Sequence, residues 1–164
     1  MIKDYGNDFK KLLGDLEKSI NVIKIDGKNF KELLNISYEI DYQSNILDKR
    51  VSPDKLDDQL ERGYLIDRSD ECIKLINKDI HTRRGVYCNL YQNNFGKCIS
   101  LVQIFIRDKK IFINEYYRSQ HLNNFKYDCQ TASLIMENLI LDLNLDPGKI
   151  TVFVMSFHKE ENNE

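Results

Sequence analysis

Residues 98–120 read CISLVQIFIRDKKIFINEYYRSQ, and this stretch decides the fold of the chain. Two runs rich in β-branched and aromatic residues flank a polar turn at 108–110. Such runs on either side of a turn predict an antiparallel hairpin. Paired residue numbers in this hairpin are expected to sum to about 219, which sets Cys98 opposite the stretch from Arg118 to His121, to within a residue or two.

Upstream of the hairpin, VYCNLYQ at 86–92 predicts another strand, joined to it by the turn-like segment NNFGK at 93–97. A meander of antiparallel strands is therefore expected. Two helices are predicted before it. One starts at 52–54, where the sequence is Ser-Pro-Asp, and a short one opens at 69–71 and contains the apolar residues Ile73, Ile76 and Ile80.

Further toward the N-terminus, the sequence predicts a helix followed by a pair of strands. The segments NVIKIDGKNF at 21–30 and NISYEI at 35–40 are β-rich, and Asp26-Gly27 is a strong tight-turn dipeptide. The preceding helix is amphipathic, because its apolar residues recur at helical spacing. They are Phe9, Leu12, Leu13, Leu16 and Ile20.

Downstream of the hairpin, a long helix is predicted to start just after Asp128, and its apolar stripe comprises Ala132, Ile135, Met136, Leu139, Ile140 and Leu143. A turn at 146–148, with the sequence Asp-Pro-Gly, leads to a last strand that ends at 156–158. We therefore expect an α+β fold, with helices packed on a mixed, mostly antiparallel sheet. Residues 1–158 are expected to form a single domain and 159–164 a loose tail.

Composition excludes several classes of function. The chain has 164 residues, with 24 basic and 26 acidic side chains and a formal charge of −2, so no broad basic field exists for nucleic acid or a membrane surface. Any phosphate must be bound locally. The first residues lack the pattern of a secretory signal, and no apolar run has membrane-spanning length, so a cytoplasmic location is expected. Four cysteines without CxxC pairs favour reduced thiols over a zinc site or a disulfide framework.

The expected hairpin register gives Cys98 a candidate chemical role. Cross-strand neighbours lie roughly 5 Å apart, so the guanidinium of Arg118 is expected near the thiol, where a positive charge favours the thiolate. The alternative is that Cys98 is a small buried apolar residue of a strand. Arg83 and Arg84 precede a strand, and their forked groups suit phosphate oxygens. A pair of solvated arginines at a sheet edge is the alternative, and at most one of the two faces a given site in the same subunit.

Other polar residues allow two interpretations each. Asp128 is either the N-cap of the long helix or a carboxylate at the edge of a pocket, where it accepts from the exocyclic amine of cytosine. His121 and His158 follow strands, but no cysteine or carboxylate completes a metal-like spacing with them. Tyr116 and Tyr117 are most simply strand residues that point to opposite faces.

Read in order, RRGVYC from Arg83, KCISLVQIFIRDKKIFINEYYRSQ from Lys97 and the segment from Asp128 to His158 resemble the thymidylate synthase and pyrimidine nucleotide hydroxymethylase family. The family has an arginine pair before a strand, a nucleophilic cysteine at the head of the next strand and Arg-Ser about twenty residues later. An Asn or Asp then opens a long helix, and a histidine closes the following strand. The resemblance is good from Arg83 to His158 and loose before it.

The resemblance implies a function in one-carbon chemistry. Cys98 matches the nucleophile that adds to C6 of a pyrimidine and makes C5 nucleophilic toward a one-carbon unit. Asp128 matches the second catalytic position, which reads the base and is Asp in enzymes that act on cytosine nucleotides. The implied substrate is dCMP, CMP or dUMP, and the implied donor is 5,10-methylenetetrahydrofolate.

The same resemblance implies ligands for the rest of a nucleotide. Arg118 and Ser119 match phosphate ligands, and His158 matches a ribose-contacting residue. Arg83 and Arg84 match arginines that reach the phosphate of the neighbouring subunit, so a homodimer is implied.

The sequence also departs from the family pattern. Lys97, Ile99, His121 and Glu160 replace a proline, a histidine, an aspartate and a tyrosine, and the chain has no tryptophan. It is shorter than most members, and the glutamate-bearing segment that relays protons to the base is not recognisable. Three hypotheses follow: a transferase to C5 of a pyrimidine nucleotide, a degenerate relative that binds a nucleotide or only dimerises, and an unrelated interaction module.

Overall fold

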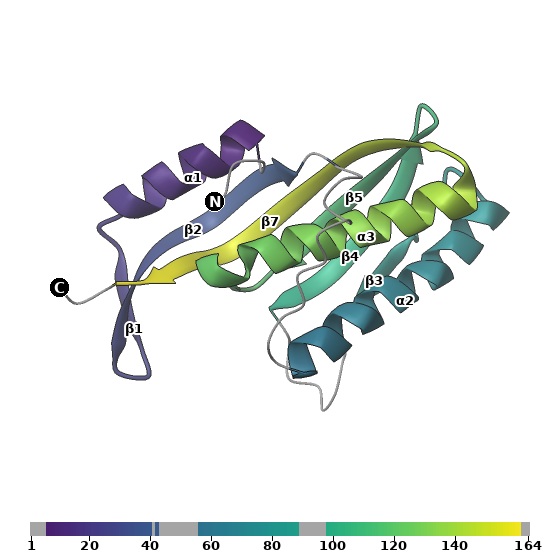
Figure 1. The fold of residues 1–164 in the computed structure, drawn as a ribbon. Coiled ribbons are helices and arrows are strands. Elements are labelled where there is room, and N and C mark those ends of the chain that lie inside the picture. The colour runs from purple at the N-terminus through teal and green to yellow at the C-terminus, as the bar shows by residue number, and fades with distance from the viewer. Residues whose placement is uncertain (1–5, 41, 43–55, 89–97, 162–164) are drawn as a thin grey trace.

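The computed structural model describes residues 6–40, 42, 56–88 and 98–161. These residues form a seven-stranded sheet in the order β1-β2-β7-β5-β4-β3, with a short β6 beside β7. Figure 1 shows the long β7 running through the middle of the sheet. The strands are β1 (Val22–Ile25), β2 (Lys28–Ile40), β3 (Val86–Cys88), β4 (Ile99–Arg107), β5 (Lys110–Tyr117), β6 (Gln120–His121) and β7 (Asp146–Glu160).

Most neighbouring strands are antiparallel, whereas β5 and β6 both run parallel to β7. A parallel pair needs a crossover connection, and α3 (Phe125–Leu143) supplies it between β5 and β7. The predicted α+β class, with a mixed and mostly antiparallel sheet, is confirmed.

The predicted hairpin forms, with a tighter turn than expected. Arg107 pairs with Lys110 across a loop of only two residues, 108–109, whose φ angles are 50° and 60°. Two positive φ values give the turn the same twist as the flanking strands, and this favours the two-residue loop. At the other end of the hairpin, the backbone N–H of Arg118 donates to the carbonyl of Cys98 at 2.9 Å. Cys98 therefore lies opposite Arg118, the first residue of the predicted stretch.

Three helices pack on one face of the sheet: α1 (Gly6–Lys18), α2 (Leu56–Lys78) and α3. In Figure 1, α3 crosses in front of β7, β5 and β4, with α2 beside it. The core lies between these layers, and its fully buried side chains include Leu16, Ile76, Met136, Ile104 and Phe157. Within the described ranges, no helix is long and apolar enough to cross a membrane.

The helix predicted to open at 69–71 is part of a longer one. Residues 69–71 lie inside α2, because Leu65, Ser69, Cys72 and Ile76 continue one buried stripe through them. The predicted start at 52–54 lies outside the described residues. Two apolar residues assigned to helices from the sequence lie outside them. Ile80 is exposed after the end of α2, and Ile20 is exposed after the end of α1.

Both ends of the third helix also differ from expectation. α3 begins at Phe125, before Asp128, because the Phe125 ring packs on Tyr38 at 5.3 Å between ring centroids and is buried there. Its C-terminal cap is Asn144, in the left-handed conformation that commonly ends helices. Residues 146–148, predicted as a turn, already belong to β7, and the first two of them pair with β5.

One predicted strand is longer than expected, and another is described only in part. Of the expected strand at 86–92, residues 86–88 form β3, and 89–92 lie outside the described residues. The last strand continues past His158 to Glu160, because its end pairs with the start of β2, where Phe30 lies opposite Glu160.

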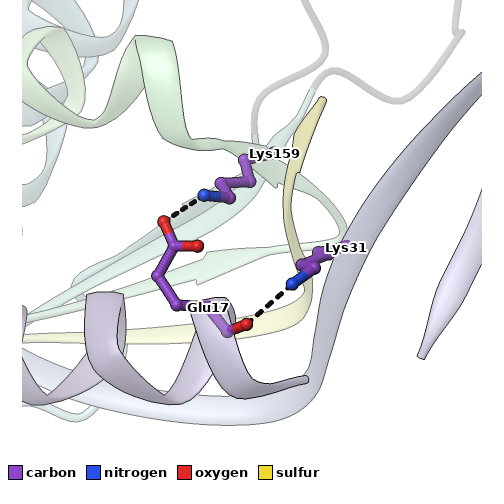
Figure 2. Close-up of polar contacts among 3 residues, drawn as sticks. All are labelled: Glu17, Lys31 and Lys159. Carbon is purple, nitrogen blue, oxygen red and sulfur yellow. Dashed lines mark hydrogen bonds and ion pairs between the residues drawn. The ribbon is translucent and has the colours of Figure 1, made fainter. Parts of the chain in front are cut away.

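The end of α1 is held where β2 and β7 meet (Figure 2). Lys31 and Lys159 are paired neighbours on these two strands. Lys159 Nζ binds the carboxylate of Glu17, and Lys31 Nζ donates to the Glu17 backbone carbonyl at 2.7 Å. The ammonium groups thus lie at the negative end of the helix dipole, and the hydrogen bond with Lys159 lowers the pKa of Glu17.

Candidate functional site

A cavity of about 110 Å³ lies beside the junction between β5 and β6. Segments far apart in the sequence form its wall. They are α2, the start of β4, the β5–β6 junction, α3 and β7. The lining residues are Leu65, Cys98, Ile99, Tyr117, Ser119, Gln120, His121, Asn124, Asp128, Thr131 and His158.

Four residues predicted from the sequence lie in this wall: Cys98, Ser119, Asp128 and His158. The topology explains their proximity. The β4–β5 hairpin brings the start of β4 to the end of β5, and the parallel pairing of β6 with β7 brings His158 beside His121. α3 then places its first turns over the same end of the sheet.

The predicted phosphate-binding arginines are not in this wall. Tyr117 is buried and lines the cavity, whereas the next residue, Arg118, is exposed, as expected for adjacent residues of a strand. The sequence predicted that Cys98 and Arg118 face one cavity, and Arg118 is not among its lining residues. Arg83 and Arg84 are also exposed, beside β3 at the far edge of the sheet from β2.

A bulge bends β4 next to Cys98. Ile99 pairs with Tyr117, but the next paired residue on β4 is Leu101, opposite Tyr116. One extra residue is therefore accommodated on β4. Such bulges re-aim side chains at strand ends and are common beside functional sites. Both Cys98, which is exposed, and its neighbour Ile99, which is buried, reach the cavity wall.

Asp128 is the end of a buried chain of hydrogen bonds. The Tyr38 hydroxyl donates to Gln120 Oε1 at 2.7 Å, and Gln120 Nε2 donates to Asp128 Oδ2 at 2.7 Å. The predicted N-cap role of Asp128 is wrong, because the N-cap is Asn124 and Asp128 lies inside α3, in its first turn. A carboxylate there is still favoured by the helix dipole.

Two histidines, His121 and His158, also line the cavity. The rings of His121 and His158 lie edge to face with centroids 5.2 Å apart, and each is nearly perpendicular to the ring of Phe30. Burial lowers the pKa of each, and the neighbouring His158 lowers that of His121 further. His121 Nδ1 accepts from the backbone N–H of Asn123 at 3.1 Å, so the proton of the neutral ring is on Nε2.

Neutral imidazoles suit hydrogen bonding to hydroxyl groups more than charge pairing with an anion. Nδ1 of His158 is buried, and the Ser156 backbone beside the ring partly offsets the effect of burial on the pKa of His158. In the part of the chain that the structure describes, no group of three or more His, Cys, Asp or Glu residues could hold a metal ion.

Gln120 and Glu115 are among the buried polar residues that the reasoning from sequence missed. Gln120 is 1% exposed and links Asp128 to Tyr38. Glu115 is wholly buried, and the hydroxyl of Tyr117 in the cavity wall donates to its Oε2 at 3.3 Å. The strand alternation does place Glu115 and Tyr117 on one face, but a run of mostly apolar residues carries no signal of a buried carboxylate.

Comparisons with known proteins identify the fold. No family model and no curated protein matches the sequence. The fold is similar to the crystal structure of thymidylate synthase from T4 phage, with a TM-score of 0.74. The match covers 96% of this chain and 78% of that one, with 14% sequence identity. The thymidylate-synthase-like fold predicted from the sequence is thus confirmed, while the identity is too low for the likeness to show more than the fold.

Proposed function

We propose that this protein transfers a one-carbon unit, as methyl or hydroxymethyl, to C5 of a pyrimidine nucleotide, with a cytosine base preferred. One observation carries the proposal: the cavity wall gathers Cys98, Ser119, Asp128 and His158 from four separate segments. These are a nucleophile, a hydroxyl donor, a carboxylate and an imidazole, the groups that such a reaction needs around a nucleotide.

In the proposed reaction, the thiolate of Cys98 adds to C6 of the base. The new S–C6 bond pushes the π electrons of the C5–C6 double bond toward C5, which becomes the nucleophile. Asp128 accepts a hydrogen bond from the exocyclic amine of the base, and His158 contacts the sugar. These contacts hold C6 against the thiol, so that addition becomes effectively unimolecular.

The phosphate is proposed to bind at Ser119 and Arg118, at the end of β5. Arg83 and Arg84 are proposed to serve the cavity of a partner subunit, because they do not line the cavity of their own chain. Arginine forks match the oxygens of a phosphate, and a change of Arg118 would act mainly on affinity for the nucleotide.

A homodimer is proposed through the sheet face away from the helices. Buried residues of β5 and β7 alternate with side chains on that face, where Tyr116 and Phe153 stack with centroids 4.9 Å apart. Phe153 is 37% exposed and Met155 61%. Phe153→Glu is expected to shift the protein toward monomer in sedimentation velocity. Leu141→Glu, at an exposed site on α3, is the matched control and should leave the assembly unchanged.

The proposed one-carbon donor, methylenetetrahydrofolate, fits the described cavity poorly. Sites for drug-sized ligands enclose about 300–1,000 Å³. The cavity of about 110 Å³ is well below this range, so the described residues enclose too little space for a base stacked on a pterin. The donor would supply the one-carbon unit when bound, whereas the residues of the cavity wall account for nucleotide binding and thiol addition.

The test uses the nucleotide analogues that trap such an adduct. The protein is incubated with 5-fluoro-dCMP, 5-fluoro-CMP or 5-fluoro-dUMP, with and without methylenetetrahydrofolate, and analysed by intact and peptide mass spectrometry. An adduct on the peptide that contains Cys98 is expected. Cys88→Ser is the matched control, because Cys88 is exposed on β3 but does not line the cavity, and this variant should keep the adduct.

The second candidate is a protein that binds a nucleotide, or only dimerises, without catalysing a reaction. The small cavity and the exposed position of Arg118 favour it. It predicts nucleotide binding, or dimerisation alone, with no adduct on Cys98 for any analogue. Binding that survives Cys98→Ser while the adduct is lost would instead support the transferase. If the protein shows neither nucleotide binding nor an adduct, only the hypothesis of a dimeric scaffold remains.

A further inference from the structure

We propose that Gln120 and Tyr38 are positioning residues that fix Asp128 as a hydrogen-bond acceptor and thereby make the site select cytosine over uracil. This inference rests on the proposed function, because it concerns how the same cavity reads a base. It assigns a role to two residues that do not belong to the nucleotide-binding set expected from the sequence.

The contacts form an unbroken chain. Tyr38 on β2 donates to Gln120 Oε1, and Gln120 Nε2 donates to Asp128 Oδ2, both at 2.7 Å. The three residues are 3%, 1% and 8% exposed, so little water competes for these hydrogen bonds. Gln120 and Asp128 line the cavity, whereas Tyr38 does not and acts only through Gln120.

Tyr38 sets the direction in which these two hydrogen bonds are donated. Burial, followed by nearby Cys129 and Asp128, raises the pKa of Tyr38 well above its usual value, so its hydroxyl keeps the proton. That proton is donated to the oxygen end of the Gln120 amide, and the amide nitrogen therefore faces Asp128. If the amide were turned around, its oxygen would face the carboxylate, and two buried acceptors would meet unless Asp128 took up a proton.

A fixed acceptor distinguishes the two bases at the atom attached to C4. Cytosine presents an amine there, which donates, whereas uracil presents a carbonyl oxygen, which accepts. Asp128 held as an ionised acceptor therefore complements cytosine and repels uracil. Without Gln120 the carboxylate loses a buried donor that holds it in place, and its preference for an amine over a carbonyl weakens.

The experiment measures the dissociation constants of dCMP and dUMP by calorimetry for the wild type, Gln120→Leu and Tyr38→Phe. The ratio of the two constants is the readout, because a merely structural defect weakens both nucleotides together. The ratio in favour of dCMP is expected to fall by a factor of about 10 or more in Gln120→Leu, and by less in Tyr38→Phe. Gln103→Leu is the matched control, because Gln103 is a half-buried glutamine on β4 outside the cavity, and its ratio should equal that of the wild type.

The outcomes separate the two proposals. A wild type that prefers dCMP, with an unchanged ratio in Gln120→Leu, would overturn the positioning role and leave the proposed function intact. A wild type that binds no cytosine or uracil nucleotide, with either ribose or deoxyribose, would overturn both. If Gln120→Leu does not fold, Tyr38→Phe decides, since it removes one hydroxyl outside the cavity, and an unchanged ratio there counts against the role.

Discussion

Gly85 stands between the exposed arginine pair and β3, and alanine at this position should destabilise the protein. A Cβ at residue 85 would lie 2.5 Å from the backbone carbonyl oxygen of Ile104. The Gly85 carbonyl meanwhile accepts from the Ile104 N–H at 2.6 Å. The backbones at Gly85 and Ile104 are therefore in close contact. Neither carbonyl group can move without disturbing the pairing of β3 with β4.

The expected magnitude follows from these distances. The added Cβ would be about 1 Å inside ordinary contact distance, which is about 3.5 Å. Overpacking of this kind costs roughly 1–3 kcal/mol. Lengthening the Ile104–Gly85 hydrogen bond costs about 1 kcal/mol more. Gly85→Ala should therefore lower the free energy of unfolding by about 2–4 kcal/mol, a large part of the 5–15 kcal/mol typical of a domain.

The assay is urea denaturation followed by circular dichroism. With a slope of about 2 kcal/mol per molar urea, the midpoint should fall by roughly 1–2 M. Gly14→Ala is the matched control. A Cβ at Gly14 meets no atom within 4 Å, and Gly14 lies inside α1, so alanine there should stabilise by about 0.5–1 kcal/mol.

A Gly85→Ala protein within about 0.5 kcal/mol of the wild type would refute the close approach of β3 to β4. Destabilisation in both variants alike would also count against it, because the expected difference comes from the space at each site and not from glycine as such.

Two further predictions concern titratable side chains. Because burial lowers the pKa of His121 and His158, the unfolded chain binds more protons than the folded one below about pH 6.5. Stability should therefore fall as the pH drops from 7.5 toward 5. His158→Gln should flatten this dependence in thermal melts across that range, and an equally steep decline in the variant would contradict the assignment. Burial raises the pKa of Cys72 to about 11, whereas Cys88 and Cys98 are exposed. A thiol reagent at pH 8 should label the two exposed cysteines first, with Cys72 protected until the protein unfolds, as peptide mass spectrometry would show.

The elements with strong local patterns could be predicted from the sequence. The turn at 26–27, the hairpin around 108–109 and the apolar stripe of the third helix all formed. Each depends on contacts within a few residues, where turn chemistry and periodicity dominate. Helix ends were predicted less well, because packing at Phe125 and along α2 overrode the local start signals.

Contacts between segments that are distant in the sequence could be predicted only from the hairpin register or from the family resemblance. The register brought Arg118 opposite Cys98, but the arginine is exposed, as strand alternation after the buried Tyr117 allows, while Cys98 reaches the cavity.

The sequence by itself determined the class of fold, the central hairpin and the candidate nucleophile Cys98 at the open end of that hairpin. These features depend on local spacing. The tertiary structure decided that β7 lies between β2 and β5, and that Gln120 links Tyr38 to Asp128. Tyr38 and Gln120 are 82 residues apart, and no local rule pairs two buried polar groups over that distance. Their meeting results from burying the apolar face of the sheet beneath α3, after which each enclosed donor needs an acceptor.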